Sequence, residues 1–184
     1  MNTERSKRSI IIYTLLIPIL LVITLVIAIL YWPQNNMKRS TKITINEGES
    51  LSIISNKLLN SGVITNEKLF ALATRIMGVE KSIPVGSYQL KDMKINKDIV
   101  NRLVYGSPEI KRITLLEGWN IKQVCDHLSK EMDFDISNLL EVINDKNFVK
   151  SLELDSENLE GYLYPETYHF FDGQGYRSVI KRLV

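Results

Sequence analysis

The side chains best suited to chemistry gather near the end of the chain, in residues 159–171, which read Leu-Glu-Gly-Tyr-Leu-Tyr-Pro-Glu-Thr-Tyr-His-Phe-Phe. This segment combines the carboxylates Glu160 and Glu166 with a density of aromatic rings far above the 8% of the whole sequence. Saccharide sites use such side chains, because sugar rings present C–H faces to aromatic rings and hydroxyls to carboxylates. Cleavage of a glycosidic bond also needs a carboxyl group at the scissile oxygen. The segment therefore indicates a saccharide-handling site.

The same segment admits a purely structural interpretation. In that case Glu160 caps a turn at Gly161, and the rings belong to the core or to a strand edge. The rings concerned are Tyr162, Tyr164, Tyr168, Phe170 and Phe171. The residue types alone leave both interpretations open.

An internal repeat supplies the elements that would position these side chains. Residues 42–58 and 112–128 align, and five pairs are identical: Ile43/Ile113, Thr44/Thr114, Glu47/Glu117, Gly48/Gly118 and Leu58/Leu128. Each copy predicts a short strand, a Glu-Gly turn, a polar N-cap at Ser50 or Asn120, and an amphipathic helix. The equivalent positions of Glu47 and Glu117 favour a turn role over a catalytic pair.

Further elements follow from capping residues and periodicity. We expect second helices that begin at Thr65 and Ser137, a strand over residues 86–90, a helix over 97–105 capped by Asn96, and an amphipathic helix over 176–184. Small sheets covered by helices make the predicted fold class α+β.

The N-terminal part predicts a membrane anchor. No residue is charged from Ser9 to Met37, and residues 10–32 are almost entirely aliphatic, long enough to cross a hydrocarbon core of roughly 30 Å. We therefore expect a cytoplasmic tail at 1–9, a single transmembrane helix at 10–32, and a linker at 33–42. With a short basic tail inside, the larger domain would lie outside the cytoplasm.

Composition excludes several classes of site. The net charge is +2, of which the first 42 residues contribute +5, so the remainder is mildly acidic and nucleic acid is not expected as a partner. One cysteine and two distant histidines, His127 and His169, disfavour disulfides and a zinc site, and no dinucleotide or phosphate loop motif occurs. We expect no cofactor and no metal. Cys125 is expected to be buried, His127 to be solvated, and Trp119 to be either core or an exposed sugar platform.

Residues 159–168 carry a specific resemblance. Together with the Ile-Thr-Leu-Leu-Glu-Gly segment that ends at Gly118, the Val-Gly-Ser-Tyr-Gln-Leu segment that ends at Leu90, and the single N-terminal span, they strongly resemble the endolytic murein transglycosylase family, also called YceG-like. The resemblance implies a membrane anchor, a LysM-like α+β module at 43–108, and the first part of an α+β catalytic domain at 109–184.

The resemblance also implies an activity. The family cuts within nascent peptidoglycan strands and leaves a 1,6-anhydro-N-acetylmuramic acid end, because the sugar's own C6 hydroxyl replaces water as the nucleophile. Its catalytic glutamate is expected in a later Ala-Ser-Ile-[Ile/Val]-Glu-Lys-Glu segment, and this sequence ends at Val184. We therefore expect the chain to be truncated before the catalytic residue and inactive alone. Glu160 is less favoured as a substitute for that acid than as a residue that supports the groove by hydrogen bonds or a cap. The candidate substrate-binding residues are Glu160, Tyr162, Tyr164, Glu166, Thr167 and Tyr168.

Two alternatives to an enzyme remain at this point. One is a non-catalytic peptidoglycan-binding or scaffold protein of the cell envelope, and the other is a truncated product without independent function. The expected partners are peptidoglycan glycan strands, the lipid bilayer through residues 10–32, and the cell-wall synthesis machinery. The expected location is the bacterial cell membrane.

Overall fold

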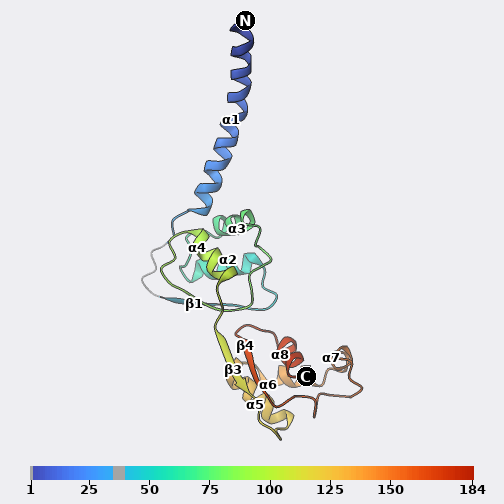
Figure 1. The fold of residues 1–184 in the computed structure, drawn as a ribbon. Helices are drawn as coiled ribbons and strands as arrows, with labels where there is room; N and C mark the ends of the chain where they lie inside the picture. Colours follow the sequence, from blue (N-terminus) through green and yellow to red (C-terminus); the bar gives the residue numbers. More distant parts are fainter. Residues whose placement is uncertain (1, 35–39) are drawn as a thin grey trace. The chain divides into compact units, whose positions relative to one another are not determined.

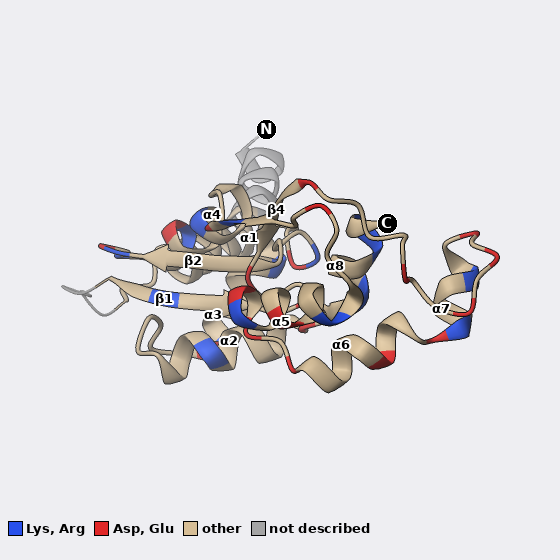
Figure 2. Cartoon of the chain, turned by 90° about the horizontal axis from the view of Figure 1, so that it is seen from below, with Lys and Arg blue, Asp and Glu red and all other residues tan. Residues whose placement is uncertain are grey.

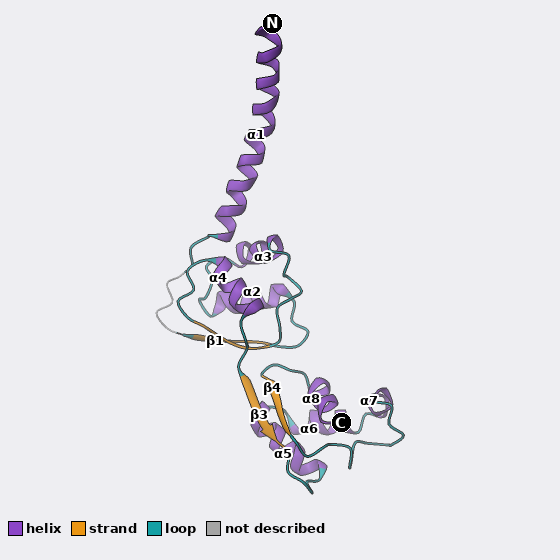
Figure 3. Cartoon of the chain, in the orientation of Figure 1, coloured by secondary structure: helices purple, strands orange, loops and turns teal. Residues whose placement is uncertain are grey.

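The computed structural model describes residues 2–34 and 40–184 of the chain, and the side chains of residues 2–13 and 15 lie outside the described part (Figure 1). The described residues form an α+β fold, which confirms the predicted class (Figure 3). The helices are α1 (Asn2–Leu30), α2 (Leu51–Asn60), α3 (Glu67–Ile76), α4 (Asn96–Tyr105), α5 (Ile121–Met132), α6 (Ile136–Ile143), α7 (Lys146–Ser151) and α8 (Tyr176–Leu183). The strands are β1 (Thr41–Ile45), β2 (Gly86–Leu90), β3 (Ile110–Thr114) and β4 (Thr167–Phe171).

The chain divides into two compact units. The first contains α1 to α4, and the second contains α5 to α8 with β3 and β4. The second unit also includes residues 44–49, 84–88 and 107–108, which were expected in the module at 43–108. The strands form two two-stranded sheets, β1 with β2 and β3 with β4.

Helix α2 of the first unit begins where the sequence indicates. The Ser50 hydroxyl accepts a hydrogen bond from the Ile53 N–H, and the chain leaves the helix at Ser61 and Gly62. Its apolar face, at Ile54 and Leu58, is fully packed into the core. The spacing of apolar residues therefore predicted these two buried positions, whereas Leu51, the third expected one, is half-buried.

Three predicted caps are wrong. Asn66 rather than Thr65 caps α3, since its side chain accepts from two backbone N–H groups while Thr65 donates to the Gln34 side chain. Asp135 rather than Ser137 caps α6, and Ser137 lies within that helix. Asn96 does not cap α4. Its buried amide accepts from Gln34 Nε2 at 2.6 Å and donates to the Ile29 carbonyl at 2.9 Å. A buried amide needs such partners, and they come from distant segments.

The second unit is organised around the pairing of β3 with β4. The two strands are antiparallel, with Ile110 opposite Phe171 and Thr114 opposite Thr167. Helix α5 starts at a capping box in which Asn120 and Gln123 bond each other's backbone N–H groups. The core of the second unit includes residues of β3, α5, β4 and α8, among them Ile113, Val124, Cys125, Leu128, Phe170, Val179 and Ile180. Helix α7 was not predicted from the sequence.

The predicted membrane span is not confirmed. Within the part of the chain that the structure describes, no helix combines the length and the apolar character that crossing a membrane requires. Parts of these predictions lie outside the described part of the chain. This applies to the side chains of the predicted tail at 1–9 and of residues 10–13 and 15 of the predicted span, and to residues 35–39 of the predicted linker.

Candidate functional site

Glu160 lies in a tight turn at the start of residues 159–171, which we call the candidate segment. The Tyr162 N–H donates to the Leu159 carbonyl at 3.1 Å, and Gly161 has a φ of 81°, a conformation that a residue with a side chain adopts only with strain. Leu159 is fully buried and anchors the turn, whereas Glu160 is exposed. The structure therefore confirms the turn at Gly161 and leaves the Glu160 carboxylate near solvent.

The same turn recurs in the described residues with an acidic residue before the glycine. In each case the N–H of the fourth residue donates to the carbonyl of the first, and the glycine has a φ between 79° and 82°. The four turns are Asn46 to Glu49, Leu116 to Trp119, Leu159 to Tyr162, and Phe171 to Gln174. The positions of Glu47 and Glu117 in turns are thus confirmed, and Glu160 shares their local geometry.

Tyr168 is part of the core. Only 8% of it is exposed, its ring stacks on Phe170 with centroids 5.8 Å apart, and its hydroxyl donates to the Tyr164 carbonyl at 2.9 Å. Burial raises the pKa of Tyr168, the charge of Glu166 raises it further, and Arg182 opposes the shift. Tyr168 and Phe170 are therefore core residues, as the structural interpretation of the aromatic rings predicted.

The other candidate residues lie nearer to solvent. Tyr164 is 64% exposed, and its N–H donates to the Leu183 carbonyl at 2.8 Å. The Glu166 carbonyl accepts from the Leu115 N–H at 3.0 Å, and the Thr167 hydroxyl lies 2.9 Å from that of Thr114. Tyr164 and Glu166 therefore lie on the stretch that leads into β4, and Thr167 is the first residue of β4. Tyr162 is half-buried in the preceding turn.

Glu47 has a structural role that its turn alone does not reveal. Its carboxylate accepts from the Ser178 hydroxyl at 2.6 Å and from the Gly175 N–H at 2.7 Å, and it thereby holds the N-terminal end of α8. We call this pair of contacts the Glu47 cap of α8. The Ser178 hydroxyl and then the Gly175 N–H hold the pKa of Glu47 below its usual value, against a small opposing effect of desolvation. A negative charge at a helix N-terminus is also favoured by the helix dipole.

The second unit contains hollows that the sequence did not predict. One, of about 270 Å³, is lined by Trp119, Gln123, Asp126, His127 and Lys130. A larger one, of about 740 Å³, lies along α6 and the start of α8, where Arg177 pairs with Asp145. Trp119 was the only signal for the first hollow, and the sequence left its environment open.

Cys125 is fully buried, as predicted, and burial raises the pKa of its thiol to about 11. The thiol is thus neither ionised nor accessible at neutral pH. Within the described residues no group of three or more His, Cys, Asp or Glu side chains could hold a metal ion.

The chain has recognisable relatives. Residues 43–184 match the model of the YceG-like family. The endolytic murein transglycosylase of Bacillus subtilis (strain 168) is 26% identical over 168 residues, which cover 82% of this chain and 46% of that protein. The chain thus spans about half the length of this relative. The crystal structure of a yceG-like protein from Listeria monocytogenes has a TM-score of 0.42 and 24% identity, with coverage of 80% of this chain and 54% of that chain.

Proposed function

Because the chain belongs to the YceG-like family, we propose that it serves the endolytic cleavage of peptidoglycan glycan strands by a lytic transglycosylase. The observation that carries the proposal is the family match over 43–184, together with a relative that is named for this activity. The exposed tyrosine and carboxylate side chains of residues 159–168 support a role in holding the glycan strand.

The proposed reaction needs one carboxyl group and no water. The carboxyl group protonates the glycosidic oxygen as the bond from that oxygen to C1 of the muramic acid residue breaks. The C6 hydroxyl of the same sugar then bonds to C1, and its proton passes to the carboxylate. One product carries a new hydroxyl and the other a 1,6-anhydro ring, so atoms and protons balance.

We assign glycan contact, rather than catalysis, to the candidate residues. A glycosidic acid works best with a raised pKa in a partly desolvated site. Glu160 instead lies exposed on a turn. Tyr162, Tyr164, Glu166 and Thr167 would contact the strand, and Tyr168 would support them from the core. On this assignment the 184-residue chain binds glycan strands without cleaving them.

A sedimentation assay with purified peptidoglycan tests this assignment. The chain should bind saturably and release no anhydromuramyl products. Tyr162→Ala and Tyr164→Ala should each weaken binding by about 0.5–1.5 kcal/mol, the order of one ring contact. Tyr105→Ala is the matched control, because Tyr105 is also exposed, at 72%, and lies in α4.

Two results would overturn the assignment. Product release that Glu160→Gln abolishes would make Glu160 the general acid. Failure of the unaltered chain to bind peptidoglycan would remove the proposed function for these residues. Binding that is weakened by the tyrosine variants without any cleavage would also fit the alternative, a non-catalytic wall-binding protein, and the exposure of Glu160 favours that alternative over catalysis by this chain alone.

We also propose that α1 attaches the protein to a membrane, as the uncharged stretch from Ser9 to Met37 suggests. Supporting this, described side chains between residues 16 and 27 include exposed Ile17 and Leu20. The protein should then stay in the membrane fraction after a carbonate wash, since electrostatic adsorption does not survive one. Recovery in the supernatant would contradict the proposal. Digestion of residues 43–184 by protease added to spheroplasts would test the expected orientation.

A further inference from the structure

Trp119 occupies a position whose backbone is held on both sides. Its N–H donates to the Leu116 carbonyl at 3.4 Å, in one of the four turns that have an acidic residue before the glycine. The next residue, Asn120, closes the capping box with Gln123, with both hydrogen bonds at 3.0 Å. A tight turn followed at once by a capped helix leaves this backbone little freedom. The indole is thus held in place without any ligand, which lowers the entropic cost of binding one.

The Trp119 ring lies between the core and the hollow. It is partly buried and packs against the core of the second unit. It also lines the hollow of about 270 Å³ and meets the His127 ring at 71°, with centroids 5.1 Å apart. Such an edge-to-face contact fixes the orientation of both rings. Part of the indole is therefore presented to whatever enters the hollow.

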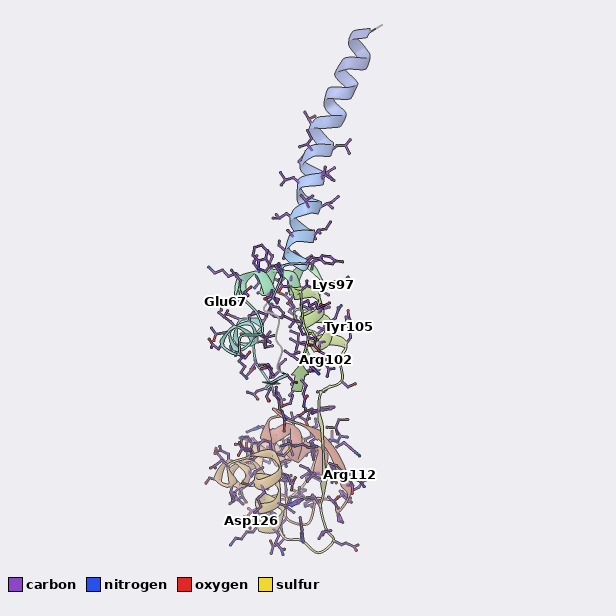
Figure 4. All side chains as sticks on the ribbon, turned by 90° about the vertical axis from the view of Figure 1, so that its left-hand side faces the viewer. Glu67, Lys97, Arg102, Tyr105, Arg112 and Asp126 are labelled. Atoms are coloured by element: carbon purple, nitrogen blue, oxygen red, sulfur yellow. The ribbon has the colours of Figure 1, made fainter. Side chains whose placement is uncertain are left out.

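Polar side chains on one face of α5 complete the lining. Gln123, Asp126, His127 and Lys130 recur at the spacing of three and four residues that places side chains on a common helix face. Figure 4 labels Asp126 on this helix. Basic and acidic residues alternate along this helix (Figure 2). The hollow thus offers an aromatic surface beside an amide, a carboxylate, an imidazole and an ammonium group. These polar groups suit a ligand that carries hydroxyl and amide groups.

We propose that this hollow binds an N-acetylated amino sugar of a glycan strand, as a subsite separate from residues 159–168. The C–H face of the sugar would rest on Trp119. Its hydroxyl and acetamido groups would bond with Gln123 and Asp126, and Lys130 would attract a carboxylate on a muramic acid residue. The volume is slightly below the roughly 300–1,000 Å³ of ligand sites and suits one sugar ring. The inference rests on the proposed function, because the ligand is the same polymer.

Trp119 itself can report binding. The chain has two tryptophans, so Trp32→Phe leaves Trp119 as the single indole fluorophore in the full chain. Titration with the tetramer of N-acetylglucosamine, and separately with purified peptide-free glycan strands, should change its emission saturably. Asp126→Asn should weaken the binding of both glycans about fivefold, and Lys130→Gln should weaken the binding of the strands about fivefold, the order of one typical hydrogen bond. Lys130→Gln should have its larger effect on the strands, since only they contain muramic acid.

A matched control keeps the test specific. Lys122→Gln removes a charge from the same helix at an exposed position that does not line the hollow, and it should leave the affinity unchanged. Gln123→Glu keeps a side chain able to complete the capping box, so a loss of binding there would not reflect loss of the helix start. Thermal melts of every variant should match that of the Trp32→Phe protein.

The outcomes separate this inference from the proposed function. If the strands bind and Tyr162→Ala weakens binding, but Trp119 emission and the Asp126 and Lys130 variants show no effect, the α5 subsite is wrong and the proposed function stands. If Lys122→Gln weakens binding as much as Lys130→Gln, the contribution is general charge attraction, and the subsite is again wrong. If neither glycan binds the chain at all, both proposals fail.

Discussion

Two tyrosines four residues apart in the candidate segment have opposite environments. Tyr164 is 64% exposed, whereas Tyr168 is 8% exposed, stacks on Phe170, and bonds through its hydroxyl to the Tyr164 backbone. A tyrosine on a strand facing the core contributes to stability, and one on a solvent-facing loop is free to bind. Although both residues are tyrosines, we therefore expect mutation of Tyr168 to affect stability and mutation of Tyr164 to affect binding.

Replacement of each ring by alanine should separate the two roles. Tyr168→Ala should lower the free energy of unfolding by about 3–5 kcal/mol, as expected for an emptied aromatic core site. Tyr164→Ala should change it by less than about 0.5 kcal/mol. Urea unfolding of both variants measures the difference. Equal losses would mean that Tyr164 is also a packing residue and would weaken its assignment to glycan contact.

Cys125 offers a second prediction for a single residue. Its thiol is fully buried, with a pKa raised to about 11, so the reactive thiolate is scarce at pH 8 and shielded from reagents. We expect Ellman's reagent to leave the native chain unlabelled at pH 8 and to label it fully in denaturant. Rapid labelling of the native chain would show that α5 opens easily or packs differently.

At the scale of elements, equivalent turns of the repeat have diverged in role. Glu47 and Glu117 occupy the same position in matching turns, yet the Glu47 carboxylate caps α8 through Gly175 and Ser178. The turn after β3 instead presents Trp119 to the hollow on α5. Both copies have the same strand, turn and helix. The elements that pack next to each turn determine which contacts its side chains make.

The Glu47 cap should make stability depend on pH. Because the folded-state pKa is below its usual value near 4.5, the carboxylate contributes fully above that pH and loses its contribution as pH falls through the lowered pKa. Glu47→Gln should cost about 0.5–1 kcal/mol at pH 7, with allowance for solvent screening of this exposed group. The cost should shrink in denaturant unfolding at increasingly acidic pH.

Glu117→Gln is the matched control for this prediction. It makes the same chemical change in the equivalent turn, at an exposed position. We expect its effect on the free energy of unfolding at pH 7 to be smaller than that of Glu47→Gln. A cost as large as that of Glu47→Gln would show that the turn itself, rather than the contact with α8, needs the carboxylate.

At the scale of the whole molecule, the second unit is assembled from three separate stretches of chain. Residues 44–49 provide the cap of α8 and a hydrogen bond from the Glu47 N–H to the Gly173 carbonyl, and residues 84–88 provide Ser87, whose hydroxyl donates to Asp172. A boundary drawn at residue 109 would separate these contacts from the strand and helix that they stabilise.

A fragment of residues 109–184 should therefore be less stable than the same residues within the full chain. Hydrogen exchange provides a local measurement. Amides of α8 should exchange at least about tenfold faster in the fragment, because the N-terminal cap is lost and one order of magnitude corresponds to about 1.4 kcal/mol of opening free energy. Unchanged protection of α8 would show that residues 44–49 and 84–88 are dispensable to this unit.

The sequence by itself determined the features that a few neighbouring residues encode. The α+β class, the repeated strand, turn and helix, the caps Ser50 and Asn120, the strand at 86–90 and the burial of Cys125 are all confirmed. Each depends on apolar periodicity or on a side chain that bonds its own backbone within one turn. The family match over 43–184 likewise confirms the resemblance that the motif at 159–168 indicated.

Only the tertiary structure decided which side chains remain available for binding. Tyr168 is buried because β4 pairs with β3, where Thr114 and Thr167 meet across 53 residues of sequence. Asn96 is a core amide because its partners, Ile29 and Gln34, come from a distant segment. Burial and hydrogen bonding between distant segments depend on how elements pack, and a local pattern of residue types contains no information about which distant element will be the neighbour.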